Sequence, residues 1–409
     1  MRSQQPQKSP ATLATLAFCM ALQMTGFVMI LPLFARRFES FGAGVDALGA
    51  SAMAYALTTT ICAPFMGLFA DRYGRRPIIL LSISAYAIAF GGYLLAASAW
   101  LFILIRGLAG VFTAGLIPAI NSAVGDLATE DRRAQWIGIV SGGAAAGWVV
   151  GPLFGGLLYD RFGYVVPFAV SIAMELGALL LALFLIPETY AVSSRRSSIR
   201  LAWSGSFRAL PALPSFYLIL FIFFSVLFAW AFVEPQFMFY AYDDLAWTSA
   251  QLGLVMSIFG MACLFSELAL GRLSDRLGRK PVLILGLALF SVAFFGLVIF
   301  RSPTWLLVCF FLGGLGDGMF DPALSAHILD ITPAEHTARI MGLKSTAGSL
   351  GNMLGPALIV LITPYVGPRI VFLIAAALVI ILTIAAAPAL RAPQRKEVTP
   401  NYSKAAVTR

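Results

Sequence analysis

Long apolar runs separated by short polar segments dominate this 409-residue chain. A helix needs about 20 apolar residues to cross the core of a bilayer. Such runs predict twelve membrane helices, close to residues 12–34, 47–70, 77–97, 100–124, 135–158, 165–186, 216–240, 249–270, 281–300, 304–328, 339–362 and 369–389. The first run is too long for the apolar part of a signal peptide, so we interpret it as a retained membrane helix.

The composition indicates that lipid is the main solvent of the chain. Hydrophobic residues make up 60% of it and charged residues 11%, against about 45–50% and about 25% in soluble globular proteins. So few charges cannot cover a water-soluble particle of this size. The composition therefore excludes a soluble enzyme, a nucleic-acid-binding protein and a disordered chain.

The basic residues predict the orientation, because short loops rich in arginine and lysine stay in the cytoplasm. With a cytoplasmic N-terminus, 21 basic residues fall on the cytoplasmic side, five fall on the other, and Arg106 and Lys344 fall inside helices. The five are Arg36, Arg37, Arg161, Arg301 and Arg369. We therefore expect both termini in the cytoplasm, and the asymmetry accounts for most of the net charge of +9.

The chain consists of two related halves. The segment from Gly67 to Pro77 recurs from Gly271 to Pro281, at an offset of 204 residues. The same offset relates Pro118 to Pro322, Asp126 to Asp330, Gly138 to Gly342, Gly147 to Gly351, Gly151 to Gly355 and Pro152 to Pro356. Two like-oriented six-helix repeats, related by an axis along the membrane normal, are one architecture of secondary transporters.

The longest polar connection begins at Glu188 and separates the two halves. We predict an N-terminal six-helix bundle over residues 1–187 and a cytoplasmic linker over 188–214. A C-terminal six-helix bundle over 215–390 and a cytoplasmic tail over 391–409 complete the predicted organisation.

Four motifs resemble those of the major facilitator superfamily of transporters. They are the signature turn at Gly67–Pro77, the helix-4 motif at Arg106–Gly110, the antiporter motif at Gly147–Gly156 and the Pro187–Thr189 sequence after helix 6. The resemblance covers the whole chain. It implies an all-α membrane protein of the major facilitator fold, with twelve transmembrane helices in two pseudo-symmetric six-helix bundles. The antiporter motif implies the twelve-helix drug/proton antiporter branch.

The signature turn carries the candidate gate. Gly74 permits a tight turn between two helices, and Asp71 can pair with Arg75 or face a helix N-terminus. The resemblance implies that Asp71 and Arg75, together with Asp126, lock the two halves in the outward-open state. In the alternative interpretation, the arginines only keep this loop in the cytoplasm.

Glycines recur every four residues along the fifth predicted helix and therefore share one face. They include Gly147, Gly151 and Gly155; Gly156 follows them, and Pro152 would bend the helix. A face without side chains lets another helix approach closely. The spacing fits ordinary helix packing as well as a directional role, and the antiport role is implied by the resemblance.

Ionisable residues inside membrane helices are costly, so each is a candidate for function. The resemblance implies that helices 1, 4, 7 and 10 line a central cavity, and Arg106, Glu234, Asp317 and Asp321 fall on those helices. Glu175 is a weaker candidate, because helix 6 usually faces outward in this family.

Asp317 and Asp321 lie four residues apart, so they share a helix face. Two neighbouring carboxylates in a low dielectric do not both ionise easily, which suits a proton carrier, and nearby glycines leave them room. Arg106 is a candidate to bind a carboxylate or tune a proton site. Alternatively, the two aspartates are structural salt-bridge partners and Glu234 lies at the outer water interface.

The first helix departs from the family pattern. Many drug antiporters of this branch carry an acidic residue midway along it, whereas this chain has Gln23 before the segment Gly26–Pro32. We therefore assign proton coupling to the C-terminal half and treat Gln23 as a candidate hydrogen-bonding group for the substrate.

These features favour a secondary transporter that exports amphipathic small molecules or drugs by proton-coupled alternating access. The alternatives are a metabolite, sugar or lipid transporter of the same fold, working by symport, uniport or efflux, and a non-transporting membrane sensor. The expected partners are the substrate, protons and the lipid bilayer of a bacterial inner membrane. We expect a monomer without enzyme activity, cofactor, metal site or nucleic-acid partner, because the sequence has no nucleotide-binding loop, metal-ligand cluster or catalytic triad.

Overall fold

The computed structural model describes residues 10–129, 131–189, 214–332 and 337–389. Every regular element in this part of the chain is helical, and twelve helical segments are long and apolar enough to cross a membrane. The predicted all-α fold with twelve membrane helices is therefore confirmed. Most of the predicted linker, and the tail at 391–409, lie outside the described residues.

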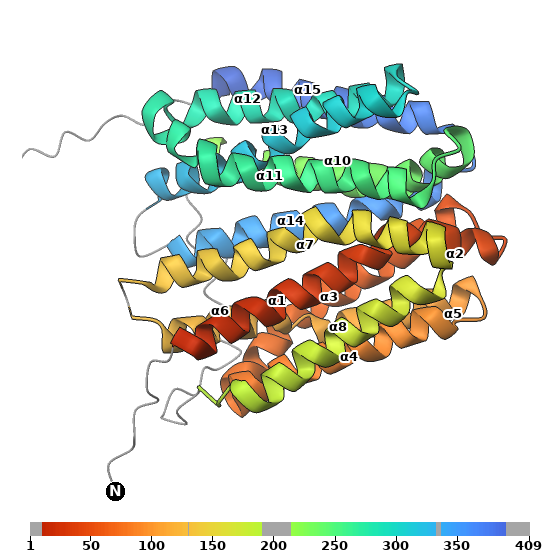
Figure 1. Ribbon diagram of the computed structural model, residues 1–409. Helices are drawn as coiled ribbons and strands as arrows, with labels where there is room; N and C mark the ends of the chain where they lie inside the picture. The colour runs from red at the N-terminus through yellow and green to blue at the C-terminus, as the bar shows by residue number, and fades with distance from the viewer. Residues whose placement is uncertain (1–9, 130, 190–213, 333–336, 390–409) are drawn as a thin grey trace, which may run out of the picture.

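The first six membrane segments form the N-terminal half, which we call the N-half (Figure 1, red to yellow-green). Its elements are α1 Pro10–Ile30, η1 Leu31–Leu33, α2 Phe34–Ser40, α3 Val45–Tyr73, α4 Arg75–Leu95, α5 Ala99–Thr113, α6 Leu116–Leu127, α7 Arg133–Phe162 and α8 Val165–Leu185. Elements α1, η1 and α2 make the first membrane segment, and α5 and α6 make the fourth.

The last six membrane segments form the C-half (Figure 1, green to blue). Its elements are α10 Pro214–Phe239, η2 Tyr240–Asp244, α11 Ser249–Leu277, α12 Arg279–Ile299, α13 Pro303–Ile331, α14 Thr337–Ile362 and α15 Pro368–Ala389. The two halves meet mainly where α7 packs on α11 and where α3 packs on α14.

Among the differences from the expected ranges, two change the description of the fold. The first extends to Ser40, so Arg36 and Arg37 lie on a helix, α2, and not in a loop. The fourth is interrupted between Thr113 and Leu116. The interruption has a local cause, because Pro118 has no N–H to donate to the carbonyl one turn earlier.

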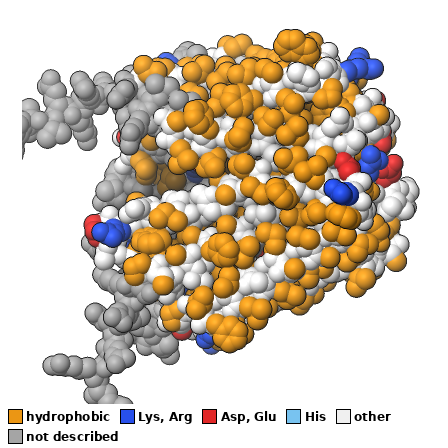
Figure 2. Space-filling model, in the orientation of Figure 1, with side chains coloured by type: hydrophobic (Ala, Val, Ile, Leu, Met, Phe, Trp, Pro, Cys, Tyr) orange, Lys and Arg blue, Asp and Glu red, His pale blue; other side chains and the backbone are white. Residues whose placement is uncertain are grey.

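The charged side chains gather at the two ends of the molecule, and hydrophobic side chains cover the face between them (Figure 2). Large apolar residues such as Ile88, Trp100 and Leu268 are among the most exposed in the protein. In water such a surface would be a liability, whereas a bilayer solvates it.

The sequence repeat is also a repeat of packing. A Cβ at Gly147 of α7 would lie 2.7 Å from the backbone nitrogen of Thr25 on α1. At the equivalent position of the C-half, a Cβ at Gly351 of α14 would lie 2.5 Å from the backbone oxygen of Phe224 on α10. Close approach of two helix backbones therefore holds the same pair of helices together in both halves.

This packing predicts a stability difference between two glycines of the same helix. Gly147→Ala places a methyl group against the α1 backbone and should destabilise the protein by about 1–3 kcal/mol. Gly142→Ala is the matched control, because its Cβ would meet no atom within 4 Å. Thermal unfolding in detergent, followed by size-exclusion chromatography, should give a lower Tm for the Gly147 variant alone. Equal melting temperatures would contradict the assigned packing.

Candidate functional site

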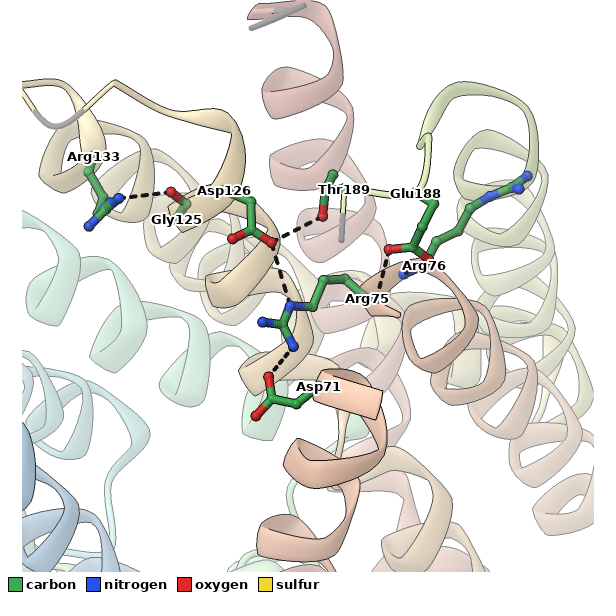
Figure 3. A network of polar contacts seen from close by, with 8 residues as sticks. All are labelled: Asp71, Arg75, Arg76, Gly125, Asp126, Arg133, Glu188 and Thr189. Atoms are coloured by element: carbon green, nitrogen blue, oxygen red, sulfur yellow. Dashed lines mark hydrogen bonds and ion pairs between the residues drawn. The ribbon is translucent and has the colours of Figure 1, made fainter. Parts of the chain in front are cut away.

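The signature turn organises a network of charges at one end of the N-half (Figure 3). Gly74 ends α3 and precedes α4 with φ +109°, a conformation that side chains other than glycine rarely adopt. The sharp turn brings Arg75 into an ion pair with Asp71, one helical turn back. The Nε of Arg75 also lies 3.5 Å from Oδ2 of Asp126 at the end of α6. The predicted gate residues are therefore neighbours, and we call this end of the molecule the network end.

Glu188 completes the network by capping α4. The backbone N–H groups of Arg75 and Arg76 donate to its two carboxylate oxygens at 3.0 and 3.3 Å. A carboxylate is favourable there, because the first N–H groups of a helix have no partner within the helix. The hydroxyl of Thr189 also donates to Asp126 at 3.4 Å.

The roles of Glu188 and Thr189 were missed by sequence reasoning, which noted the Pro187–Thr189 motif only as a feature common after helix 6. The position of Glu188 in the sequence supplied a usable signal. An acidic residue directly after the sixth membrane helix returns to the same side of the membrane as the turn between the second and third helices.

The C-half carries a counterpart of this network. Arg279 opens α12 as Arg75 opens α4, and its Nε lies 3.1 Å from Oδ2 of Asp330. Gly278 before it has φ +92°. The offset of 204 residues therefore relates the ion pairs as well as the turns. The described contacts of Asp71, Arg75 and Asp126 all lie within the N-half, so in this conformation those contacts do not join the halves.

The opposite end, where α2 and η2 lie, is sealed by contacts between the halves. Asp160 near the end of α7 accepts hydrogen bonds from the backbone N–H groups of Ser249 and Ala250, at 3.0 and 2.8 Å. These two groups open α11, so Asp160 caps a helix of the other half. Nearby, the hydroxyl of Tyr242 donates to the Pro32 carbonyl at 3.1 Å. We call this the sealed end.

The sealed end also contains a cation–π contact between the halves and a small pocket. The guanidinium of Arg36 lies 4.0 Å from the centre of the Tyr242 ring. A cavity of about 420 Å³ there is lined by Arg36, Glu39, Ser40, Tyr159, Asp160 and Ser249. Hydrogen bonds between the halves, among the described residues, lie at this end or on the adjoining part of α7.

The antiporter-motif helix α7 contacts both halves. Gly147, Gly151 and Gly155 face α1, where a Cβ would collide with the backbone. Gly156 packs against Ser249 of α11, and the Pro152 carbonyl packs against Gly253 of α11. The glycine face of the motif therefore packs on α1, while Pro152 and Gly156 contact α11 of the other half.

Arg106 lies within a cluster of aromatic rings inside the N-half. Its side chain on α5 is only 5% exposed. The guanidinium lies 4.6–5.9 Å from the ring centres of Phe27, Phe34, Tyr55 and Tyr93. Such contacts stabilise a desolvated cation. Its Nε has no hydrogen-bond partner among the described residues.

Glu234 of the other half interacts with this cation. It precedes Pro235 on α10 and is partly buried. Glu234 interacts electrostatically with Arg106, although no ion pair within 4.0 Å joins it to a described residue. The structure thus brings together two of the predicted residues, one from each half, at a separation longer than a direct salt bridge.

Asp321 pairs with a lysine that sequence reasoning left out of the site. Lys344 on α14 is 7% exposed and forms an ion pair with Asp321 of α13. Its ammonium also donates to the Ser325 hydroxyl at 2.6 Å and lies 4.4 Å from the centre of the Phe223 ring. The signal was a single lysine inside an otherwise apolar run. Asp321 is therefore paired with a base, as one of the two interpretations of the sequence expected.

Asp317 lies one turn away among groups of like charge. The Cys263 thiol donates to its Oδ2 at 3.7 Å, and Asp321 and Glu267 interact with it electrostatically. The neighbouring glycines do not leave room, contrary to the sequence interpretation. Gly314 and Gly318 of α13 let that helix pack directly on the α11 backbone, which places Asp317 beside Cys263.

Gln23 and Glu175 lie inside the N-half. Gln23 on α1 is 2% exposed, and its Nε2 has no hydrogen-bond partner among the described residues. Glu175 on α8 is fully buried, so the expectation that it faces outward is wrong. The cause is the packing of α8 against α1 and α4, which covers the face that carries this carboxylate.

Two six-helix repeats with charges held between them define a secondary transporter of the membrane. The chain belongs to the Major Facilitator Superfamily, since the model of that family matches residues 13–242 and 219–408.

Curated relatives cover nearly the whole chain. The multidrug resistance protein MdtG of Klebsiella pneumoniae (strain 342) is 27% identical over 387 residues, which are 92% of this chain and 92% of that protein. MdtG of Proteus mirabilis (strain HI4320) is 29% identical over 387 residues, covering 91% and 94%. With the twelve apolar helices, these bacterial relatives identify a multi-pass protein of the bacterial inner membrane.

Solved structures share the fold. A bacterial homologue of the human lysosomal transporter Spinster, in an inward-facing and unoccupied conformation, has a TM-score of 0.74 at 17% identity, covering 96% of this chain and all of that one. The nucleoside transporter NupG has a TM-score of 0.76 at 16% identity, covering 93% of this chain and 100% of that one. At these identities the likeness shows the fold alone.

The cap on α4 predicts a graded loss of stability. Glu188→Ala removes the acceptor of two backbone N–H groups and should destabilise the N-half by about 0.5–2 kcal/mol. Glu188→Gln keeps one oxygen acceptor without the charge and should fall between the alanine variant and wild type. Thermal unfolding in detergent measures the order, and an alanine variant as stable as wild type would contradict the cap.

Proposed function

We propose that this protein exports amphipathic small molecules, drugs among them, in exchange for protons by alternating access. The observation that carries the proposal is the electrostatic interaction between Glu234 of the C-half and Arg106 of the N-half, inside the membrane. The Glu234 carboxylate and the Arg106 guanidinium belong to opposite halves and form no direct salt bridge. Binding of a substrate or a proton can therefore change their electrostatic interaction. The names of the curated relatives, multidrug resistance proteins, support export of drugs.

The distribution of basic residues supports a cytoplasmic network end and cytoplasmic termini. The sealed end then faces the outside, and the structure is an inward-facing conformation. In this state substrate reaches the site from the cytoplasm while Asp160 and Tyr242 close the outer side. Protons enter from the outside only after the seal opens, so exchange follows the alternation of the two ends.

The chemistry around the two ionisable groups favours amphipathic substrates. The rings of Phe27 and Tyr55 lie against Arg106, and the ring of Phe223 lies against Lys344. Aromatic surfaces bind varied apolar groups, while a few polar groups orient them. Glu234 and Asp317 are the proposed proton carriers, and substrate displaces a proton by interacting with the same carboxylates.

The network of Asp71, Arg75 and Asp126 is the proposed inner gate. Its ion pairs are already formed within the N-half. We expect the same residues to contact the C-half when the network end closes. Its contacts to the other half would exist in only one of the two states, so they bias the equilibrium toward that state. We further propose that the protein acts as a monomer, has no enzymatic activity and is divided at 187/188 and 214/215, with the tail starting at 391.

The coupling role of Glu234 predicts loss of gradient-driven transport. Glu234→Gln removes the titratable proton and keeps the shape, so proton-driven uptake of substrate into inverted vesicles should fall at least about tenfold. Substrate binding should persist. Asp46→Asn is the matched control, because Asp46 is exposed on the first turn of α3 at the sealed end. Full gradient-driven transport by the Glu234 variant would refute its role.

The direction of transport has its own test. An uncoupler added to intact cells should raise the accumulation of substrate, because an exporter loses its driving force when the gradient collapses. Uptake symport gives the opposite result, and a uniporter gives no change.

The gate role of Asp71 predicts a shifted conformational equilibrium. Asp71→Asn removes the charge that would contact the C-half when the network end closes, and a partly exposed ion pair contributes up to about 1 kcal/mol, a factor of about five in population. The inward-facing fraction, measured by spin-label distances across the network end, should rise accordingly. Asp131→Asn changes an exposed aspartate at the same end and is the control. Equal populations in wild type and the Asp71 variant would rule out the gate.

A further inference from the structure

Glu175 is a buried carboxyl group that the proposed transport site does not use. It lies midway along α8 and its side chain is 0% exposed. Neither carboxylate oxygen has a hydrogen-bond partner among the described residues. A charged carboxylate in such a place, without donor or cation, is far less stable than a neutral carboxylic acid.

The packing of α8 on α1 shows what faces Glu175. The Cys19 thiol donates to the Ala178 carbonyl at 3.5 Å, and the Ser171 hydroxyl donates to the Gly26 carbonyl at 2.8 Å. The two helices therefore run antiparallel with a fixed register, which places Glu175 level with Gln23 and its neighbour. Gln23 carries an unpartnered buried N–H donor, and Glu175 carries two unpartnered acceptors.

Helix α4 also packs on α8, and it contributes a tyrosine near Glu175. Tyr86 interacts electrostatically with Glu175, and its hydroxyl lies 2.9 Å from the hydroxyl of Tyr55 on α3. Tyr55 also reaches the Thr113 hydroxyl at 3.3 Å, and Arg106 lies 4.6 Å from its ring centre. Hydroxyl groups thus connect the surroundings of Arg106 with Tyr86, which interacts electrostatically with Glu175 without a direct hydrogen bond.

Within the part of the chain that the structure describes, no charged group offsets this burial. Cys19 of α1 and Tyr86 of α4 are the titratable side chains that interact with Glu175 among the described residues, and both are neutral as thiol and phenol. From α7, the other helix that packs on α8, no described side chain forms an ion pair with it within 4.0 Å.

We propose that Glu175 is a further proton-binding site of the transporter, located in the N-half. In the inward-facing state it is a carboxylic acid, with the proton on one carboxylate oxygen. Before the halves rearrange, the proton passes through the Tyr86 and Tyr55 hydroxyls to water that is open to the cytoplasm, and the amide of Gln23 donates to the carboxylate left behind. In the outward-facing state the reverse transfer takes a proton from water that is open to the outside and restores the acid. This inference rests on the proposed proton-coupled function.

The test uses Glu175→Gln in the full-length protein, purified and reconstituted into liposomes. The amide copies a neutral carboxylic acid in shape but carries no exchangeable acid proton. Gradient-driven transport of a fluorescent amphipathic dye should fall at least about tenfold, as for removal of an acid–base group. Counterflow of the same dye without a gradient should persist, and the proton-to-dye ratio of any residual transport should be lower than in wild type. Asp46→Asn should leave all three measurements unchanged.

Two outcomes overturn the inference while the proposed function stands. In the first, wild type is driven by the gradient and Glu175→Gln matches it in rate and stoichiometry, so the carboxyl group is neutral and only structural. In the second, Glu175→Gln does not fold although Glu234→Gln does, so the native group is not a neutral acid.

A spectroscopic measurement keeps the inference testable if the function fails. If the proton gradient does not drive dye transport by the wild-type protein, the proposed function itself is refuted. The infrared carbonyl band of a protonated carboxylic acid should still be present in wild type, respond to a change of pH and be missing from Glu175→Gln. A spectrum without such a band, or with a band that pH leaves unchanged, would by itself refute the proposed proton site at Glu175.

Discussion

The structure depends on one constraint: lipid solvates neither backbone polar groups nor charges. Helices satisfy the backbone internally, and the charges at the two ends reach water. What remains inside must find its partner in the protein, and Arg106 among aromatic rings and Lys344 with Asp321 are two solutions. Glu175, Glu234 and Asp317 have no basic partner within 4.0 Å among the described residues, and these are the groups to which proton chemistry is assigned.

The duplication applies to the scaffold and not to the chemistry. Turns, glycine faces and the Arg75–Asp126 pair all recur at the offset of 204 residues. The internal charges do not, since the equivalents of Arg106, Glu234, Asp317, Asp321, Lys344 and Glu175 are Phe310, Ile30, Thr113, Ile117, Val140 and Val379. A symmetric scaffold therefore provides two similar motions, while an asymmetric set of side chains makes the two directions chemically different.

The number of helices and the repeat followed from apolar runs and a constant offset, and the ion pair of Arg75 with Asp71 was one of two contacts expected for Asp71 in the signature turn. The rotation of each helix about its axis did not, and it decides what a side chain meets. α10 is apolar all round, so nothing in its pattern distinguishes the face of Glu234. Glu175 and Lys344 were undervalued for the same reason, because burial against α1 or pairing with α13 depends on tertiary packing. The cap by Glu188 joins residues more than 100 positions apart, which no local pattern reveals.

The cap that Asp160 places on α11 also determines how the sealed end opens. Its two donors are backbone N–H groups at the start of a helix, so the contact does not depend on any side chain of α11. When the halves separate at this surface, water can replace the carboxylate at both donors and hydrate the carboxylate in turn. Opening therefore exchanges hydrogen bonds instead of losing them, and a closure with defined geometry remains easily reversible.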